Sequence, residues 1–142
     1  TSAYNMVFYY KFIMGDYVSY TYQYKVELFK SIHKYIKNGP VVASEYRARL
    51  KKYLNKETNY KYSIEKLNKS WNTYKNEIDN NRMCLLFLLP NIFNGHFVNG
   101  VGTTIYDTGA TYCVIFDNWV SANRFMLLGS YVNSISKIYI YK

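Results

Sequence analysis

One histidine and one aspartate stand at the ends of neighbouring apolar runs. His96 precedes the glycine-punctuated run that starts at Phe97, and Asp117 follows the apolar run Tyr112 to Phe116. If the two runs are adjacent antiparallel strands, these two residues meet at one end of the sheet. An imidazole beside a carboxylate forms the base and the orienting group of a nucleophilic triad. The sequence therefore predicts a His96–Asp117 pair that needs a nucleophile.

The chain offers two thiols, Cys84 and Cys113, and both lie inside apolar runs. A thiol attacks as its thiolate, which is favoured at a helix N-terminus or beside a cation. Neither cysteine has such a setting in the sequence, so we expect both to be core residues, with a disulfide between them left open. No Cys and His spacing resembles a zinc site, and we expect neither a metal nor a cofactor.

Apolar runs separated by turn-forming residues predict the strands that would position the pair. Asp107-Thr108-Gly109 predicts a hairpin turn between two of them. Pro90, followed by Asn91 to Gly95, predicts a turn before His96. The expected strands cover residues 60–67, 82–89, 97–106, 111–116, 124–128 and 135–141.

Helical spacing of apolar residues predicts four helices, mostly in the first half of the chain. The first helix is nearly all apolar or aromatic, so it should be buried on most sides, with Thr1-Ser2 able to cap it. Asn38-Gly39-Pro40 should end the second. Helices followed by antiparallel strands are typical of an α+β fold, and we expect a single domain over residues 1–142. The expected helices cover residues 3–14, 26–36, 44–56 and 70–78.

Composition sets further limits on function. The 142 residues are 49% hydrophobic, which is enough for one core. A net charge of +9 favours anionic partners by long-range attraction but defines no site. Basic residues interleaved with base-stacking aromatics are not evident, so we expect no nucleic-acid binding. No run approaches the roughly 18 apolar residues of a membrane span, and no signal peptide opens the chain.

From Ser70 onward the sequence resembles papain-like cysteine peptidases of the bacteriocin-leader-processing type, the broad family thirty-nine-like group. The order and spacing of four motifs carry the resemblance: Glu77 to Arg82, Gly95 to Val98, Val101-Gly102 and Asp117-Asn118-Trp119. The resemblance implies a papain-like α+β fold, with N-terminal helices packed on a C-terminal antiparallel sheet. It implies His96 as the catalytic histidine, Asp117 as its orienting residue, Trp119 as the shielding ring and Asn118 as a supporting turn residue.

Two departures from the family pattern lie close to this site. Met83 stands where the family has proline, and Asn99-Gly100 replaces two apolar strand positions. We expect looser strand packing there.

The first residues extend the resemblance. Thr1 to Tyr10 is similar to the segment that follows a Cys-x-Pro sequence in the family, where the cysteine opens the central buried helix. The resemblance therefore implies a nucleophile about three residues before Thr1, and a side chain upstream of it that completes the oxyanion hole. Between Tyr17 and Leu67 the resemblance is weak.

The implied reaction is hydrolysis of a peptide bond in a peptide or protein substrate through a thioester acyl-enzyme. The chain as it stands would be inactive, because it lacks the cysteine. The resemblance implies a bacterial protein and is compatible with a secreted or cell-surface location. Two alternatives stay open: a catalytically inactive peptide-binding module on the same fold, and a structural or surface-interaction protein whose tyrosine-rich helices mediate assembly or bind anionic partners.

Overall fold

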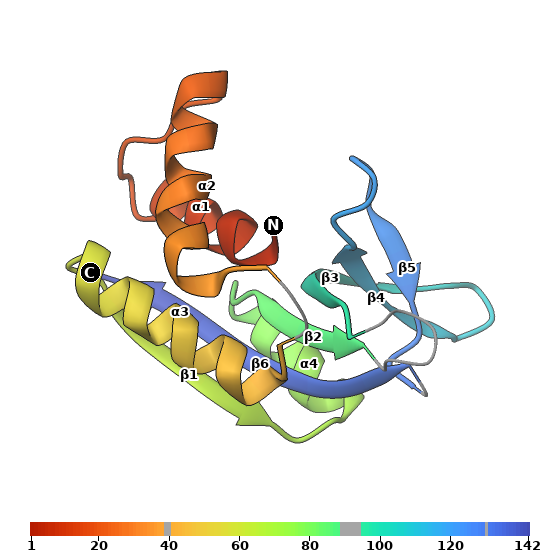
Figure 1. The fold of residues 1–142 in the computed structure, drawn as a ribbon. Helices are drawn as coiled ribbons and strands as arrows, with labels where there is room; N and C mark the ends of the chain where they lie inside the picture. The colour runs from red at the N-terminus through yellow and green to blue at the C-terminus, as the bar shows by residue number, and fades with distance from the viewer. Residues whose placement is uncertain (39–40, 89–94, 130) are drawn as a thin grey trace. The chain divides into compact units, whose positions relative to one another are not determined.

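The computed structural model describes residues 1–38, 41–88, 95–129 and 131–142. In these ranges the chain forms four helices and a six-stranded antiparallel sheet (Figure 1). The predicted mixture of helices and antiparallel strands is therefore confirmed. The strand order is β1-β6-β2-β3-β4-β5. The elements are α1 (Ser2–Ile13), α2 (Tyr22–Ile36), α3 (Ala43–Glu57), β1 (Lys61–Leu67), α4 (Trp71–Asp79), β2 (Cys84–Leu88), β3 (Phe97–Ile105), β4 (Thr111–Phe116), β5 (Arg124–Met126) and β6 (Val132–Tyr141).

The chain divides into two compact units. The helical unit comprises residues 1–64 and 139–142, and the sheet unit comprises residues 65–138. We describe each unit separately.

Helix α1 supplies much of the core of the helical unit. Its residues from Ser2 to Lys11 are buried or half-buried, and only Phe12 and Ile13 at its C-terminal end are exposed. The prediction of a largely buried first helix is therefore confirmed, except at that end. Thr1 occupies the N-cap position, but its side chain makes no capping hydrogen bond.

Helices α2 and α3 are amphipathic and pack through their apolar faces. Helical spacing puts Tyr46, Leu50, Tyr53 and Leu54 on one face of α3, and all four are buried. The Tyr35 and Tyr53 rings meet edge to face with their centroids 5.9 Å apart. Arg49 donates to the main-chain oxygen of Ile36 at 2.5 Å, which places a cation at the C-terminus of α2, where the helix dipole favours positive charge.

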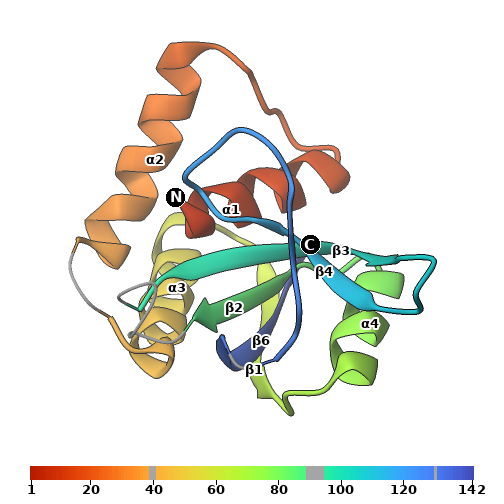
Figure 2. The ribbon, with the colours of Figure 1, turned by 90° about the vertical axis from the view of Figure 1, so that its right-hand side faces the viewer.

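Strand β2 is an interior strand of the sheet. It pairs antiparallel with β3 on one side and β6 on the other, so Cys84 lies opposite both Gly100 and Lys137. β3 and β4 form the predicted hairpin, and Gly109 in its turn has a φ of 78° (Figure 2). Helix α4 covers one face of this sheet, and its Tyr74 is fully buried among Leu86, Val98 and other apolar residues.

Packing is tight beside Gly100, contrary to the looseness expected from the sequence. A Cβ atom at Gly100 would lie 2.6 Å from Cε2 of Tyr74, so only glycine leaves room for the tyrosine ring. The Tyr74 hydroxyl donates to the main-chain oxygen of Gly102 at 2.8 Å, beside a β-bulge between Gly100 and Gly102. Asn99 is also fully buried. Gly100, one of the two residues that break the family's apolar pattern, thus accommodates a buried tyrosine.

Most predicted boundaries are confirmed to within a few residues, and two elements are longer than expected. α2 begins at Tyr22 because Thr21 caps it by accepting from the backbone N–H of Tyr24. β6 begins at Val132, before the expected Ile135, and Ser134 in the added part pairs with Phe87. The predicted turn at residues 90–94 and the breaker Gly39-Pro40 lie outside the described residues.

Candidate functional site

His96 lies immediately before β3, in the position predicted from the sequence. Its main-chain oxygen accepts from the N–H of Leu88 at 2.9 Å, so the β2–β3 ladder fixes its backbone. Gly95 before it has a φ of 71°, a conformation that glycine adopts without strain. The strand ladder and this turn position the half-buried imidazole at the end of the sheet.

The imidazole of His96 has two contacts that fix its orientation. Nε2 lies 2.5 Å from the main-chain oxygen of Asp117. Because a carbonyl oxygen only accepts, Nε2 carries the proton. The indole of Trp119 stacks on the imidazole, with ring centroids 4.3 Å apart and planes 14° apart. In the neutral ring, Nδ1 then holds the lone pair, and no side chain or main-chain group in the described ranges binds it.

Asp117 approaches His96 as predicted, but with a different atom. The sequence led us to expect its carboxylate as the acceptor, whereas the structure uses its main-chain oxygen. The carboxylate points elsewhere: Oδ1 accepts from the N–H of Trp119 at 3.0 Å and of Val120 at 3.3 Å. These bonds close a turn over residues 117–120, so the buried carboxylate shapes the segment that carries both the acceptor and the stacking ring.

Asn118 supports the same turn. Its φ of 68° is left-handed, a conformation that asparagine tolerates better than most residues. Its side-chain amide donates to the main-chain oxygen of Phe97 at 3.1 Å, which ties the turn to the start of β3. Asn118 therefore holds the segment after β4 beside His96, as expected of a supporting turn residue.

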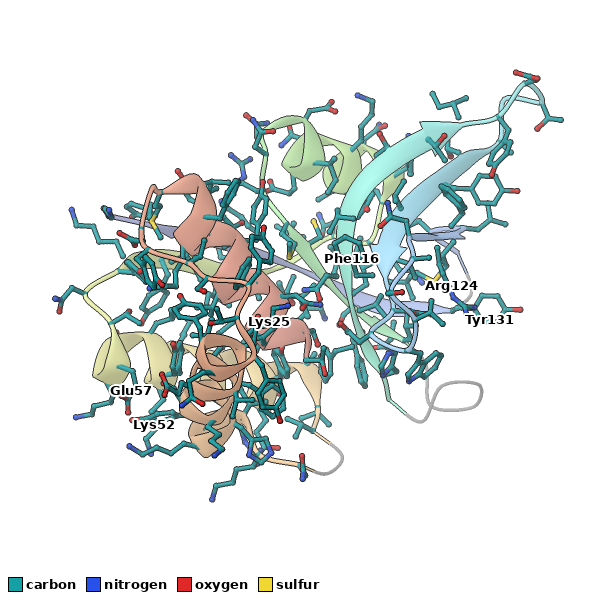
Figure 3. The ribbon with its side chains drawn as sticks, turned by 90° about the horizontal axis from the view of Figure 1, so that it is seen from above. Lys25, Lys52, Glu57, Phe116, Arg124 and Tyr131 are labelled. Carbon is teal, nitrogen blue, oxygen red and sulfur yellow. The ribbon has the colours of Figure 1, made fainter. Side chains whose placement is uncertain are left out.

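Arg124 completes the arrangement and was missed in the sequence. Its Nε lies 2.8 Å from Oδ2 of Asp117, and its side chain is 54% exposed (Figure 3). The pairing register explains the contact, since Arg124 on β5 lies opposite Ile115 on β4, two residues before Asp117. The sequence does show an arginine shortly after the Asp-Asn-Trp motif. It could be assigned to Asp117 only with the knowledge that β4 pairs with β5.

The two cysteines are buried core residues, as expected, and both are free thiols. Burial raises the pKa of the Cys84 thiol to about 12, and the nearby Glu77 carboxylate acts in the same direction. Burial also raises the pKa of Cys113 to about 12, against the opposing effect of its hydrogen-bonding contact with Tyr74. Both thiols therefore stay protonated at neutral pH and cannot act as nucleophiles there.

Tyr46 on α3 is buried beside the N-terminal turn of α1, in the helical unit. Burial raises the pKa of its phenol well above the usual range, while the nearby Ser2 hydroxyl and Ala3 main chain act in the opposite direction.

Residues 1–38, 41–88, 95–129 and 131–142 lack two further features that would bear on function. No group of three or more His, Cys, Asp and Glu side chains in these ranges could hold a metal ion. No helix there is both long and apolar enough to cross a membrane.

No protein-family model, curated protein or solved structure matches the chain.

Proposed function

We propose that this chain is a cysteine-peptidase-like domain of the papain-like type, which hydrolyses peptide bonds with His96 as its general acid and base. One observation carries the proposal: Nε2 of His96 donates to the main-chain oxygen of Asp117, so the lone pair of the neutral ring is on Nδ1. A histidine held by one nitrogen, with no group of the described residues bound to the other, has the arrangement that nucleophilic catalysis requires.

The proposed reaction needs a cysteine within reach of Nδ1. Nδ1 accepts the thiol proton, and the thiolate adds to the carbonyl carbon of the peptide bond. The tetrahedral intermediate breaks its C–N bond as Nδ1–H gives the proton to the leaving amine, which leaves a thioester on the cysteine. Water then loses a proton to Nδ1 and attacks the thioester, and the sulfur regains that proton as the acid product leaves.

The sequence resemblance assigns the nucleophile to a cysteine about three residues before Thr1. Two observations support that assignment. First, the pKa values of Cys84 and Cys113 are too high for either to serve. Second, α1 is a 12-residue helix, and a helix N-terminus favours a thiolate beside it.

The turn between α4 and β2 also supports the family resemblance. Arg82 makes a two-point ion pair with the buried carboxylate of Glu77, with Nε 2.5 Å from Oε2 and Nη2 3.1 Å from Oε1. Asn81, directly before the arginine, has a φ of 56°. Glu77, Asn81 and Arg82, all within the motif from Glu77 to Arg82, thus take part in one turn.

The test uses the complete natural protein, including whatever residues precede Thr1, and measures cleavage of a mixed peptide library by mass spectrometry. We expect turnover that His96→Ala abolishes and that His33→Ala, at the other histidine, preserves. Turnover retained by His96→Ala would contradict the proposal. Saturable peptide binding without turnover would instead indicate the inactive binding module.

A further inference from the structure

The positive charge is concentrated in the helical unit. Residues 1–64 and 139–142 contain 12 Lys and Arg against four Asp and Glu, a net charge of +8, whereas residues 65–138 contain six against five. Such asymmetry indicates an anionic partner for the charged part. This net charge attracts an anionic partner over long distances, but it does not say which surface contacts that partner. Other features must identify the surface.

Exposed apolar side chains follow one another along the connection between α1 and α2, where the rings of Tyr17 and Tyr20 pack against those of Tyr24 and Phe8. We call this group the aromatic tip: Phe12, Ile13, Tyr17, Tyr20 and Tyr22. Their exposed fractions are 59, 47, 77, 72 and 82%. Large apolar side chains gathered on one surface commonly mark an interaction site, whereas scattered ones need no explanation.

The backbone beneath the aromatic tip is held in place. The Tyr24 hydroxyl donates to the main-chain oxygen of Tyr17 at 3.0 Å. Asp16 accepts from the Tyr60 hydroxyl at 2.5 Å and pairs with Lys142 at 2.6 Å. The tip is therefore a preformed surface, and binding through it requires little ordering of the connection.

Exposed lysines on α2 supply positive charge near these rings. Lys25, labelled in Figure 3, has its Nζ 5.6 Å from the centre of the Tyr20 ring, and Lys30 is exposed further along α2. Tyrosine has an apolar ring and a polar end, which suits the headgroup level of a bilayer, and lysine is attracted to anionic headgroups.

We propose that the aromatic tip, with Lys25 and Lys30, docks the protein on the surface of an anionic lipid bilayer. This surface binding is independent of peptidase activity. A single-stranded nucleic acid fits the observations less well, because it needs a basic groove alongside the stacking rings. The hollow next to Tyr17, of about 480 Å³, is lined by the carboxylates of Asp16 and Glu57 as well as by Lys11, so it is not such a basic groove.

The test measures co-sedimentation of the complete protein with vesicles of equimolar phosphatidylcholine and phosphatidylserine, and with vesicles of phosphatidylcholine alone. We expect binding to the anionic vesicles only, weakened by added salt. One lysine near such a surface contributes about a fivefold change in partitioning, so Lys25→Gln should weaken binding by about that factor. The double variant Tyr20→Ser, Tyr22→Ser should weaken it further.

Matched controls come from the sheet unit. Tyr131→Ser and Lys66→Gln make the same changes at exposed positions of residues 65–138, and both should bind as the wild type does. Far-UV circular dichroism checks that each variant is folded. His96→Ala should bind vesicles normally, which separates this proposal from the proposed peptidase.

Four results would overturn the proposal. The first is no binding to anionic vesicles, and the second is a loss of vesicle binding in the control variants equal to that in the tip variants. The third is unchanged vesicle binding in the tyrosine double variant. The fourth is displacement of the protein from vesicles by a single-stranded oligonucleotide that binds the same residues. Self-association that needs the tip tyrosines, without vesicle binding, would identify a second copy of the chain as the occupant and reject the lipid.

Discussion

Asp117→Asn separates two ways in which Asp117 could orient His96. In the structure, Nε2 of His96 donates to the main-chain oxygen of Asp117, and the carboxylate binds Trp119 N–H, Val120 N–H and Arg124. A change confined to the side chain leaves the main-chain acceptor in place. We therefore expect His96 to keep its proton on Nε2 in this variant.

The expected cost follows from the contacts that are lost. The amide oxygen of asparagine can still accept from the two N–H groups, but these bonds become neutral, a loss of about 1 kcal/mol. The ion pair with the half-exposed Arg124 contributes at most about 1 kcal/mol after solvent screening. We expect destabilisation of about 1–2 kcal/mol and a fall in turnover of less than about tenfold. A carboxylate that held the imidazole directly would instead make the loss about ten-thousandfold, because an amide selects the wrong tautomer.

The assay combines nitrogen-15 NMR of the His96 ring, which reports the protonated nitrogen, with turnover by the complete protein. Asp107→Asn, at an exposed position in the β3–β4 turn, is the matched control for the chemical change. A shift of the His96 proton to Nδ1 in Asp117→Asn, or a loss near ten-thousandfold, would refute the role of the main-chain oxygen.

Two further predictions concern stability. Gly100→Ala should lower the free energy of unfolding, measured in urea, by about 1–3 kcal/mol, because the new Cβ would lie 2.6 Å from the Tyr74 ring. Gly129→Ala is the control and should change it little, because no atom lies within 4 Å of the Cβ position there. Hydrogen bonds from Lys142 and Tyr60 hold the pKa of Asp16 below its ordinary value of 3.8. The ionised carboxylate thus stabilises the fold above that pH and loses this effect as the pH falls through the lowered pKa. The difference in unfolding free energy between wild type and Asp16→Asn should therefore shrink between neutral pH and about pH 3, and a constant difference would contradict this assignment.

The sequence was sufficient to predict most elements and the neighbourhood of the site. Apolar periodicity located α3 and its buried face, and the Asp107-Thr108-Gly109 turn located the β3–β4 hairpin. Placing His96 before one strand of that hairpin and Asp117 after the other was enough to bring them together. These features could be predicted because each depends on residues that are close together in the sequence.

What could not be predicted depends on contacts between distant segments. The atom of Asp117 that meets His96 is set by the turn at residues 117–120 and by Arg124 on β5. The need for Gly100 comes from Tyr74 on another element, so the sequence made it look like a packing defect. The start of β6 was hidden because a buried serine, Ser134, stands where an apolar residue would extend the pattern from Ile135 back to Val132.

The most direct test of the proposed active site is the rate of iodoacetamide labelling of the complete natural protein as a function of pH, followed by peptide mapping. We expect fast labelling near neutral pH of one cysteine before Thr1, a large loss of that rate in His96→Ala, and no fast labelling of Cys84 or Cys113. A natural protein without that cysteine, or a cysteine there whose labelling does not depend on His96, would contradict the proposed catalytic site.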